Sequence, residues 1–153
     1  MTEEDKNLLI QDLCARLPYG VKVLTLFENK EVNGLLEAVY PEDDRIIISN
    51  LSRSCHYLKQ DCGGFIIEEN GCKPYLFPLS SMTEEQKKFF KDRPIFLDSE
   101  NELVVKEDFF GNSRFTMLDD WVEVILWLVK NHFDYRGLIP KGLAIDATGL
   151  NIY

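Results

Sequence analysis

Apolar residues near the start of the chain recur at every fourth position. The residues that share this spacing are Leu9, Leu13 and Leu17. Such a spacing gives one apolar stripe along a helix. Thr2 stands where an N-cap belongs, and the three acidic residues after it suit the positive end of the helix dipole. Pro18 ends the pattern, so we expect a helix over 1–17 that docks on the rest of the fold.

After this helix the period of the apolar residues changes from four to two. Apolar and polar residues alternate over 21–27, and a second segment of strand character covers 32–40. A β-branched run over 45–49 predicts a third strand. Three strands in succession predict an antiparallel meander. The pattern over 21–48 also resembles that of small barrels of the SH3 or Sm type.

The middle of the chain combines a short strand with a proline-rich stretch. Residues 65–69 predict a strand that is closed by an Asn-Gly turn. Pro74 and Pro78 argue against a regular helix or a central strand. We therefore expect 73–79 to be extended or 3₁₀, with buried side chains.

A short helix and a hairpin follow. Thr83 and Gln86 have the spacing of a capping box, which predicts a helix from there to about residue 91. Two apolar runs, 95–97 and 103–105, are separated by a polar, turn-rich linker. This arrangement predicts a β-hairpin.

The last helix is expected over 118–131, after a start at Ser113 or Thr116. Its apolar positions are Leu118, Trp121, Val122, Val124, Ile125, Leu126, Trp127, Leu128 and Val129. A helix that is apolar nearly all round is buried, so we expect this one to be central. The remaining stretch, 132–153, carries nine large apolar or aromatic side chains and is expected to dock on the body.

These elements predict a single compact α+β domain over 1–153. It consists of a docking helix over 1–17, a mostly β region over 20–107, and a helix with a docked C-terminal segment over 116–153. The β region is expected to be an antiparallel meander or a small SH3/Sm-like barrel. The C-terminal helix is expected to be buried.

Composition and charge restrict the classes of function. The chain has 153 residues, 45% of them hydrophobic, and a net charge of −9. No apolar run reaches the roughly 18 residues that span a bilayer, so we expect no membrane segment. The acidic balance disfavours nucleic-acid binding. The chain begins without the basic and then apolar pattern of a leader, so we expect a cytoplasmic protein with free thiols.

Three stretches of the sequence carry a resemblance. They are 17–21 (LPYGV), 73–85 (KPYLFPLSSMTEE) and 132–144, with HFDYRGLI followed by GLA. Together they resemble a group of small proteins that are frequent in gut Bacteroides-type bacteria and their phage-like or mobile elements. The resemblance implies an intracellular bacterial or phage-like setting. It brings no activity, cofactor or catalytic residue.

Four residues could be considered as metal ligands: Cys55, His56, Cys62 and Cys72. Zinc knuckles place two cysteines two to four residues apart, because a short turn must aim both thiolates at one ion. The spacings here are longer, so we interpret these cysteines as small buried or loop side chains. No phosphate-binding or dinucleotide motif is present, and we expect no cofactor.

A nucleophilic site would need His132 and Asp134 together with a thiol such as Cys55, because such partners meet in space rather than in sequence. The alternative for His132 is a helix C-cap, in which the imidazole hydrogen-bonds the last carbonyls. Asp119, Asp120 and Glu123 are interpreted as a solvated acidic face rather than as a metal site.

These observations favour a non-enzymatic accessory module that binds a protein partner or forms a homo-oligomer. Phe109 and Phe110 are the candidate exposed binding patch. The first alternative is a small hydrolase or nuclease-like enzyme that uses His132 and Asp134. The second is a small-barrel nucleic-acid-binding protein with a basic face, whose candidate residues are Lys22, Lys30, Arg45 and Arg53.

Overall fold

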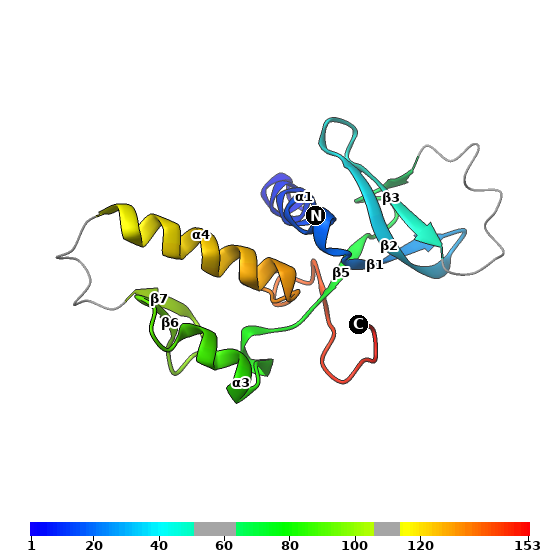
Figure 1. Cartoon of the computed structure of the whole chain (residues 1–153). Helices are drawn as coiled ribbons and strands as arrows, with labels where there is room; N and C mark the ends of the chain where they lie inside the picture. The colour runs from blue at the N-terminus through cyan, green and yellow to red at the C-terminus, as the bar shows by residue number, and fades with distance from the viewer. Residues whose placement is uncertain (51–63, 106–113) are drawn as a thin grey trace.

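The computed structural model describes residues 1–50, 64–105 and 114–153, and for 50 and 114–117 it describes the backbone alone. Figure 1 shows two groups of elements that meet at the middle of the molecule. A sheet and helix α1 form one group. Helices α3 and α4 and a β-hairpin form the other. The α+β class predicted from the sequence is confirmed.

Helix α1 (Glu3–Arg16) lies within the predicted range 1–17 and begins directly after the predicted N-cap Thr2. The hydroxyl of Thr2 accepts a hydrogen bond from the Asp5 amide at 3.1 Å, which caps the first turn. A 3₁₀ turn η1 (Leu17–Tyr19) follows, and Gly20 then adopts a positive φ of 71° that releases the chain into the sheet. The apolar stripe of α1 packs on the sheet in the first core cluster.

Six strands form an open sheet in the order β4-β3-β2-β1-β5-β8. The first three are β1 (Lys22–Phe27), β2 (Lys30–Tyr40) and β3 (Arg45–Asn50), joined after β2 by the 3₁₀ turn η2 (Pro41–Asp43). They pair antiparallel in sequence order, as the meander prediction requires. Within the described residues β4 (Phe65–Ile66) and β8 (Ile145–Asp146) are the edges, so the barrel does not close.

Strand β5 (Lys73–Leu76) corrects the prediction that prolines exclude a central strand here. It pairs antiparallel with β1 through Lys73 and Pro74, and parallel with β8 through Tyr75 and Leu76. Each residue therefore pairs on one side only. Pro74 lies before the β8 pairing begins, so its missing N–H is tolerated at an interior position.

The second group of elements is built around α4 (Arg114–Lys130). It contains the 3₁₀ turn η4 (Leu79–Ser81), helix α3 (Glu84–Lys87) and the 3₁₀ turn η5 (Lys88–Phe90). It also contains the predicted hairpin of β6 (Ile95–Leu97) and β7 (Leu103–Val105), which is confirmed. The predicted capping box of α3 is present too, because Thr83 and Gln86 bond each other's backbone amides.

The prediction that α4 is buried nearly all round is wrong. Val124, Leu128 and Val129 are buried, but Leu118, Val122 and Leu126 are exposed by 65%, 52% and 49%. The reason is that described elements pack on one side of the helix only. The helix is therefore half-buried, with an apolar face directed to solvent.

Two hydrophobic clusters form the core of the described residues. The first lies between α1 and the sheet, and the second between α4, η5 and β6. The segment after α4 docks on both, as predicted: Phe133 belongs to the second cluster, and Leu138 and Leu143 to the first. This segment ties the two groups of elements together.

Candidate interaction surface

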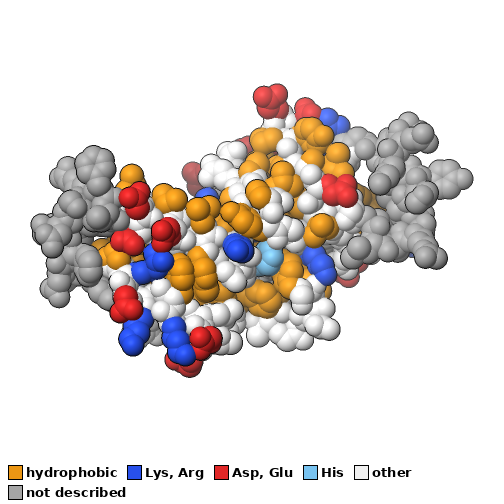
Figure 2. All heavy atoms as spheres, in the orientation of Figure 1, with side chains coloured by type: hydrophobic (Ala, Val, Ile, Leu, Met, Phe, Trp, Pro, Cys, Tyr) orange, Lys and Arg blue, Asp and Glu red, His pale blue; other side chains and the backbone are white. Residues whose placement is uncertain are grey.

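The exposed side of α4 carries a row of three apolar side chains, which we call the α4 stripe: Leu118, Val122 and Leu126. They are spaced four residues apart, so they lie along one side of the helix. Figure 2 shows hydrophobic side chains following α4, with acidic side chains beside them. Sequence reasoning named these residues but assigned them to the interior. Their spacing of four was the signal that could have identified a separate face.

An acidic edge borders the α4 stripe. Asp119 and Glu123 each follow a stripe residue by one position, which is a rotation of about 100° around the helix. Glu123 Oε2 accepts a hydrogen bond from Arg93 Nη1 at 2.7 Å, and Asp120 Oδ1 lies 3.4 Å from the same nitrogen. Asp119 makes no ion pair with a described residue. Of the three residues expected to form a solvated acidic face, Asp120 and Glu123 thus pair with Arg93, and Asp119 is exposed without such a partner.

The inner side of α4 is held rigidly by aromatic packing. The Trp127 ring lies between those of Phe89 and Phe133, stacked at centroid distances of 4.6 and 5.7 Å. Phe90 meets the same indole edge-on at 5.7 Å. Stacked and edge-on pairs add about 0.5–1.5 kcal/mol each beyond the area that they bury. The exposed stripe is thus presented by a helix whose position is fixed.

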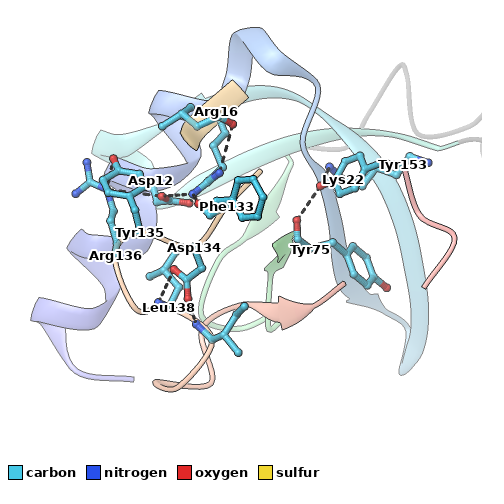
Figure 3. A network of polar contacts seen from close by, with 12 residues as sticks. Asp12, Arg16, Lys22, Tyr75, Phe133, Asp134, Tyr135, Arg136, Leu138 and Tyr153 are labelled. Atoms are coloured by element: carbon cyan, nitrogen blue, oxygen red, sulfur yellow. Dashed lines mark hydrogen bonds and ion pairs between the residues drawn. The ribbon is translucent and has the colours of Figure 1, made fainter. Parts of the chain in front are cut away.

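The end of α4 is fixed by a fully buried ion pair from α1 (Figure 3). Arg16 Nε and Nη2 donate to the Asp12 carboxylate at 2.6 and 3.0 Å, and both side chains are 0% exposed. Arg16 Nη2 also donates to the Phe133 carbonyl at 2.8 Å, and Arg16 Nη1 donates to the carbonyl of Val129 in α4 at 3.4 Å. A guanidinium at a helix C-terminus satisfies the last carbonyls and suits the dipole. The sequence analysis did not single out this pair, although its i, i+4 spacing is visible there.

A small cavity lies between α3 and β6. Its volume is about 230 Å³, and its lining residues are Lys87, Phe90, Lys91, Phe96 and Leu97. The walls are mostly apolar, and two ammonium groups belong to the lining. Lys87 Nζ pairs with Glu84 at 3.0 Å, whereas Lys91 has no ion-pair partner among the described residues.

The His132 and Asp134 side chains, which we considered as a catalytic pair, make no hydrogen bond with each other. Both Asp134 oxygens accept backbone N–H groups instead, from Leu138 at 2.8 Å and from Ile139 at 2.7 Å. Asp134 therefore closes the turn after α4. The bond between base and orienting carboxylate that a triad requires is not made. Cys55 lies outside the described residues.

The prediction that His132 caps α4 through its imidazole is not realised. Its ring stacks on Tyr153 at 4.1 Å with an interplanar angle of 10°, and its Nδ1 is buried without a hydrogen-bond partner. Burial, followed by the nearby Arg16 charge, lowers the pKa of His132 to about 4. His132 is therefore neutral at pH 7. Its φ of 59° ends the helix in the left-handed region.

Tyr153 bridges two strands where their direct pairing ends. Its hydroxyl donates to the Tyr75 carbonyl at 2.7 Å and accepts from the Lys22 amide at 3.2 Å. Figure 3 shows these groups around the ring. Burial raises the pKa of Tyr153 to about 12, so this hydroxyl stays protonated well above neutral pH. The arrangement anchors the C-terminal segment.

The described cysteines show no sign of activation. Burial raises the pKa of Cys72 to about 11, and burial also raises the pKa of the Cys14 thiol. Neither is a thiolate at neutral pH. No group of His, Cys, Asp or Glu in the described part of the chain could hold a metal ion. Of the candidate zinc ligands, Cys55, His56 and Cys62 lie outside that part.

The candidate basic face is divided among separate contacts. Lys22 Nζ donates to the Ile152 carbonyl, and Arg45 pairs with Asp43. Lys30 is exposed at the start of β2. The remaining candidates, Arg53 of this face and the Phe109 and Phe110 patch, lie outside the described residues.

Within residues 1–50, 64–105 and 114–153, no helix has the length and apolar character needed to cross a membrane. Comparisons with protein-family models, curated proteins and solved structures gave no match. The physical features of the chain therefore carry the argument about function.

Proposed function

We propose that this chain is a non-enzymatic protein-binding module that docks a partner on the α4 stripe. The proposal includes the cytoplasmic, bacterial or phage-like setting that the sequence resemblance implies. The observation that carries it is the exposure of Leu118, Val122 and Leu126 on a helix whose inner side is fixed in the core. Contiguous apolar side chains on a rigid surface are typical of interaction sites.

The occupant that fits this surface is an amphipathic helix whose apolar stripe is bordered by Lys or Arg. The spacing of the α4 stripe suits helix-on-helix packing, in which side chains three and four residues apart interdigitate. Asp119 has no partner among the described residues, and the Glu123 side chain is 62% exposed. A basic border on the partner would complement this acidic edge and speed the encounter.

A second copy of the chain fits less well. A two-fold antiparallel pairing of α4 with itself would place one acidic edge against the other, because such a pairing keeps equivalent flanks on the same side. The net charge of −9 on each copy adds to the repulsion. Charge therefore favours a basic partner over a homodimer.

The test is a titration of two labelled helical peptides, measured by fluorescence anisotropy. Both carry the same Leu stripe, bordered by Lys in one peptide and by Glu in the other. We expect the Lys peptide to bind and the Glu peptide to bind at least tenfold more weakly. Val122→Asp is expected to weaken binding of the Lys peptide about tenfold or more, since burying one aliphatic side chain contributes ~1.5–3 kcal/mol.

The matched control is Tyr40→Asp, which places the same charge at a site on β2 that is 46% exposed and away from α4. It is expected to leave binding unchanged. Equal binding of the two peptides would overturn the proposal that the partner has a basic border. Failure of both to bind, or binding that Val122→Asp does not affect, would overturn the docking site. Dimerisation in sedimentation that Val122→Asp abolishes would identify the second copy as the occupant instead.

A further inference from the structure

We infer that the cavity between α3 and β6 binds a small aromatic carboxylate. This site is separate from the α4 stripe, and it does not depend on the proposed function. Its residues are Phe90, Phe96 and Leu97, which supply apolar wall, and Lys87 and Lys91, which supply positive charge.

The apolar wall is suited to a flat ring. Two of its three members are phenylalanines, and aromatic rings favour stacked or edge-on contact with other rings. Phe90 is buried, and it contacts Trp127 edge-on at 5.7 Å and Phe89 edge-on at 5.3 Å. The wall is therefore backed by the second core cluster, so it keeps its shape when the cavity is empty.

The volume limits the size of the ligand. A cavity of about 230 Å³ is smaller than the roughly 300–1,000 Å³ of sites for drug-sized ligands. The pocket is open to solvent on one side, so a ligand there is covered only in part, unlike benzene in an enclosed cavity of ~150 Å³. One six-membered ring with a short acidic arm matches this space.

The charges select an anion. Lys91 has no ion pair among the described residues, so it can bind a carboxylate without losing an existing partner. Lys87 is already held by Glu84 at 3.0 Å, and its neighbour Lys88 is held by Glu85. Lys91 is therefore the main source of anion selectivity, and Lys87 is the secondary one. The pocket therefore combines an aromatic wall with an ammonium group that has no ion pair among the described residues.

The experiment titrates the ¹⁵N-labelled protein with phenylacetate, with the uncharged phenylacetamide and with acetate, following amide shifts by NMR. We expect phenylacetate to shift residues 87–97 in a saturable way. Phenylacetamide is expected to bind about two- to fivefold more weakly, because an exposed ion pair contributes up to ~1 kcal/mol. Acetate lacks the ring and is expected to give no saturable shift there.

Two lysine variants distinguish the effect of a charge that lines the pocket from the effect of the protein's overall charge. Lys91→Gln is expected to weaken the binding of phenylacetate about two- to fivefold and to leave the binding of phenylacetamide unchanged. Lys88→Gln, one turn away and outside the lining, is the matched control and is expected to change neither. Shifts that cluster elsewhere, equal binding of acid and amide, or equal effects of the two variants would overturn the proposal. None of these outcomes bears on the peptide test of the α4 stripe.

Discussion

Replacing Arg16 by methionine should cost this protein a large part of its stability. Methionine keeps much of the apolar stem but removes the guanidinium that neutralises Asp12. Both side chains are 0% exposed, so the carboxylate would be left buried with Arg136 Nε at 3.6 Å as its nearest cation. Breaking a buried pair on one side costs ~3–5 kcal/mol. That is a large share of the ~5–15 kcal/mol that stabilises a typical domain.

The double variant Asp12→Leu, Arg16→Met should recover much of this loss, because no fully buried charge remains. Arg136 loses its contact with Asp12, but its side chain is 26% exposed and reaches solvent. The carbonyls that lose Arg16 keep backbone donors: His132 N to Val129 O and Tyr135 N to Phe133 O, both at 3.1 Å. No buried acceptor is then left unsatisfied, and replacing both charges is often close to neutral. The two substitutions should therefore be coupled by about 2 kcal/mol or more.

The assay is urea unfolding followed by the fluorescence of Trp121 and Trp127. The matched control is Lys141→Met, which breaks the exposed Lys141–Asp5 pair at 2.8 Å and should cost far less stability than Arg16→Met, because solvent screens an exposed pair. The reasoning is refuted if Arg16→Met lowers the free energy of unfolding by less than Lys141→Met does. It is also refuted if the double variant is as unstable as Arg16→Met. If Arg16→Met does not fold at all, the double variant must fold for the reasoning to stand.

Three further predictions concern the sheet and the C-terminal segment. Gly34→Ala should destabilise the fold by ~1–3 kcal/mol in urea, because its Cβ would lie 2.0 Å from the Ser49 carbonyl oxygen. Tyr153→Phe should cost about 0.5–1.5 kcal/mol, because loss of the bridging hydroxyl removes a hydrogen-bond partner from one backbone group of β1 and one of β5. Tyr40→Phe should cost almost nothing, because the Tyr40 hydroxyl makes no hydrogen bond with a described residue and the side chain is equally exposed, at 46% against 45% for Tyr153. Lastly, His132 has a folded pKa of about 4 against 6.5 when unfolded, so its contribution is present above pH 6.5 and lost as the pH falls through 4. His132→Phe should flatten this acid dependence in urea unfolding measured from pH 7 to pH 4, and an unchanged slope would contradict the assignment.

Local signals predicted the local elements well. The N-cap at Thr2 and the capping box of Thr83 and Gln86 are both present as the sequence indicated. The β-branched run over 45–49 is strand β3. Each of these depends on residues a few positions apart, so the information that decides it lies within one short segment.

Longer-range features could not be predicted in the same way. Pro74 was expected outside a central strand, yet it lies in β5, because β1 and β8 pair with different residues of that strand. His132 was expected to cap a helix, yet its ring stacks on Tyr153, 21 positions further along the chain. Both outcomes depend on which distant segments pack beside the residue.

The sequence by itself determined the kind and order of the elements, the acidic exterior and the absence of a knuckle-type zinc motif, because composition, periodicity and capping are local properties. Only the tertiary structure decided which side of α4 faces solvent and that Asp12 and Arg16 meet without water. The physical reason is that exposure and charge desolvation are set by neighbours distant in sequence. The α4 stripe is apolar in either case; the packing of one face, and not the other, makes it a candidate docking surface.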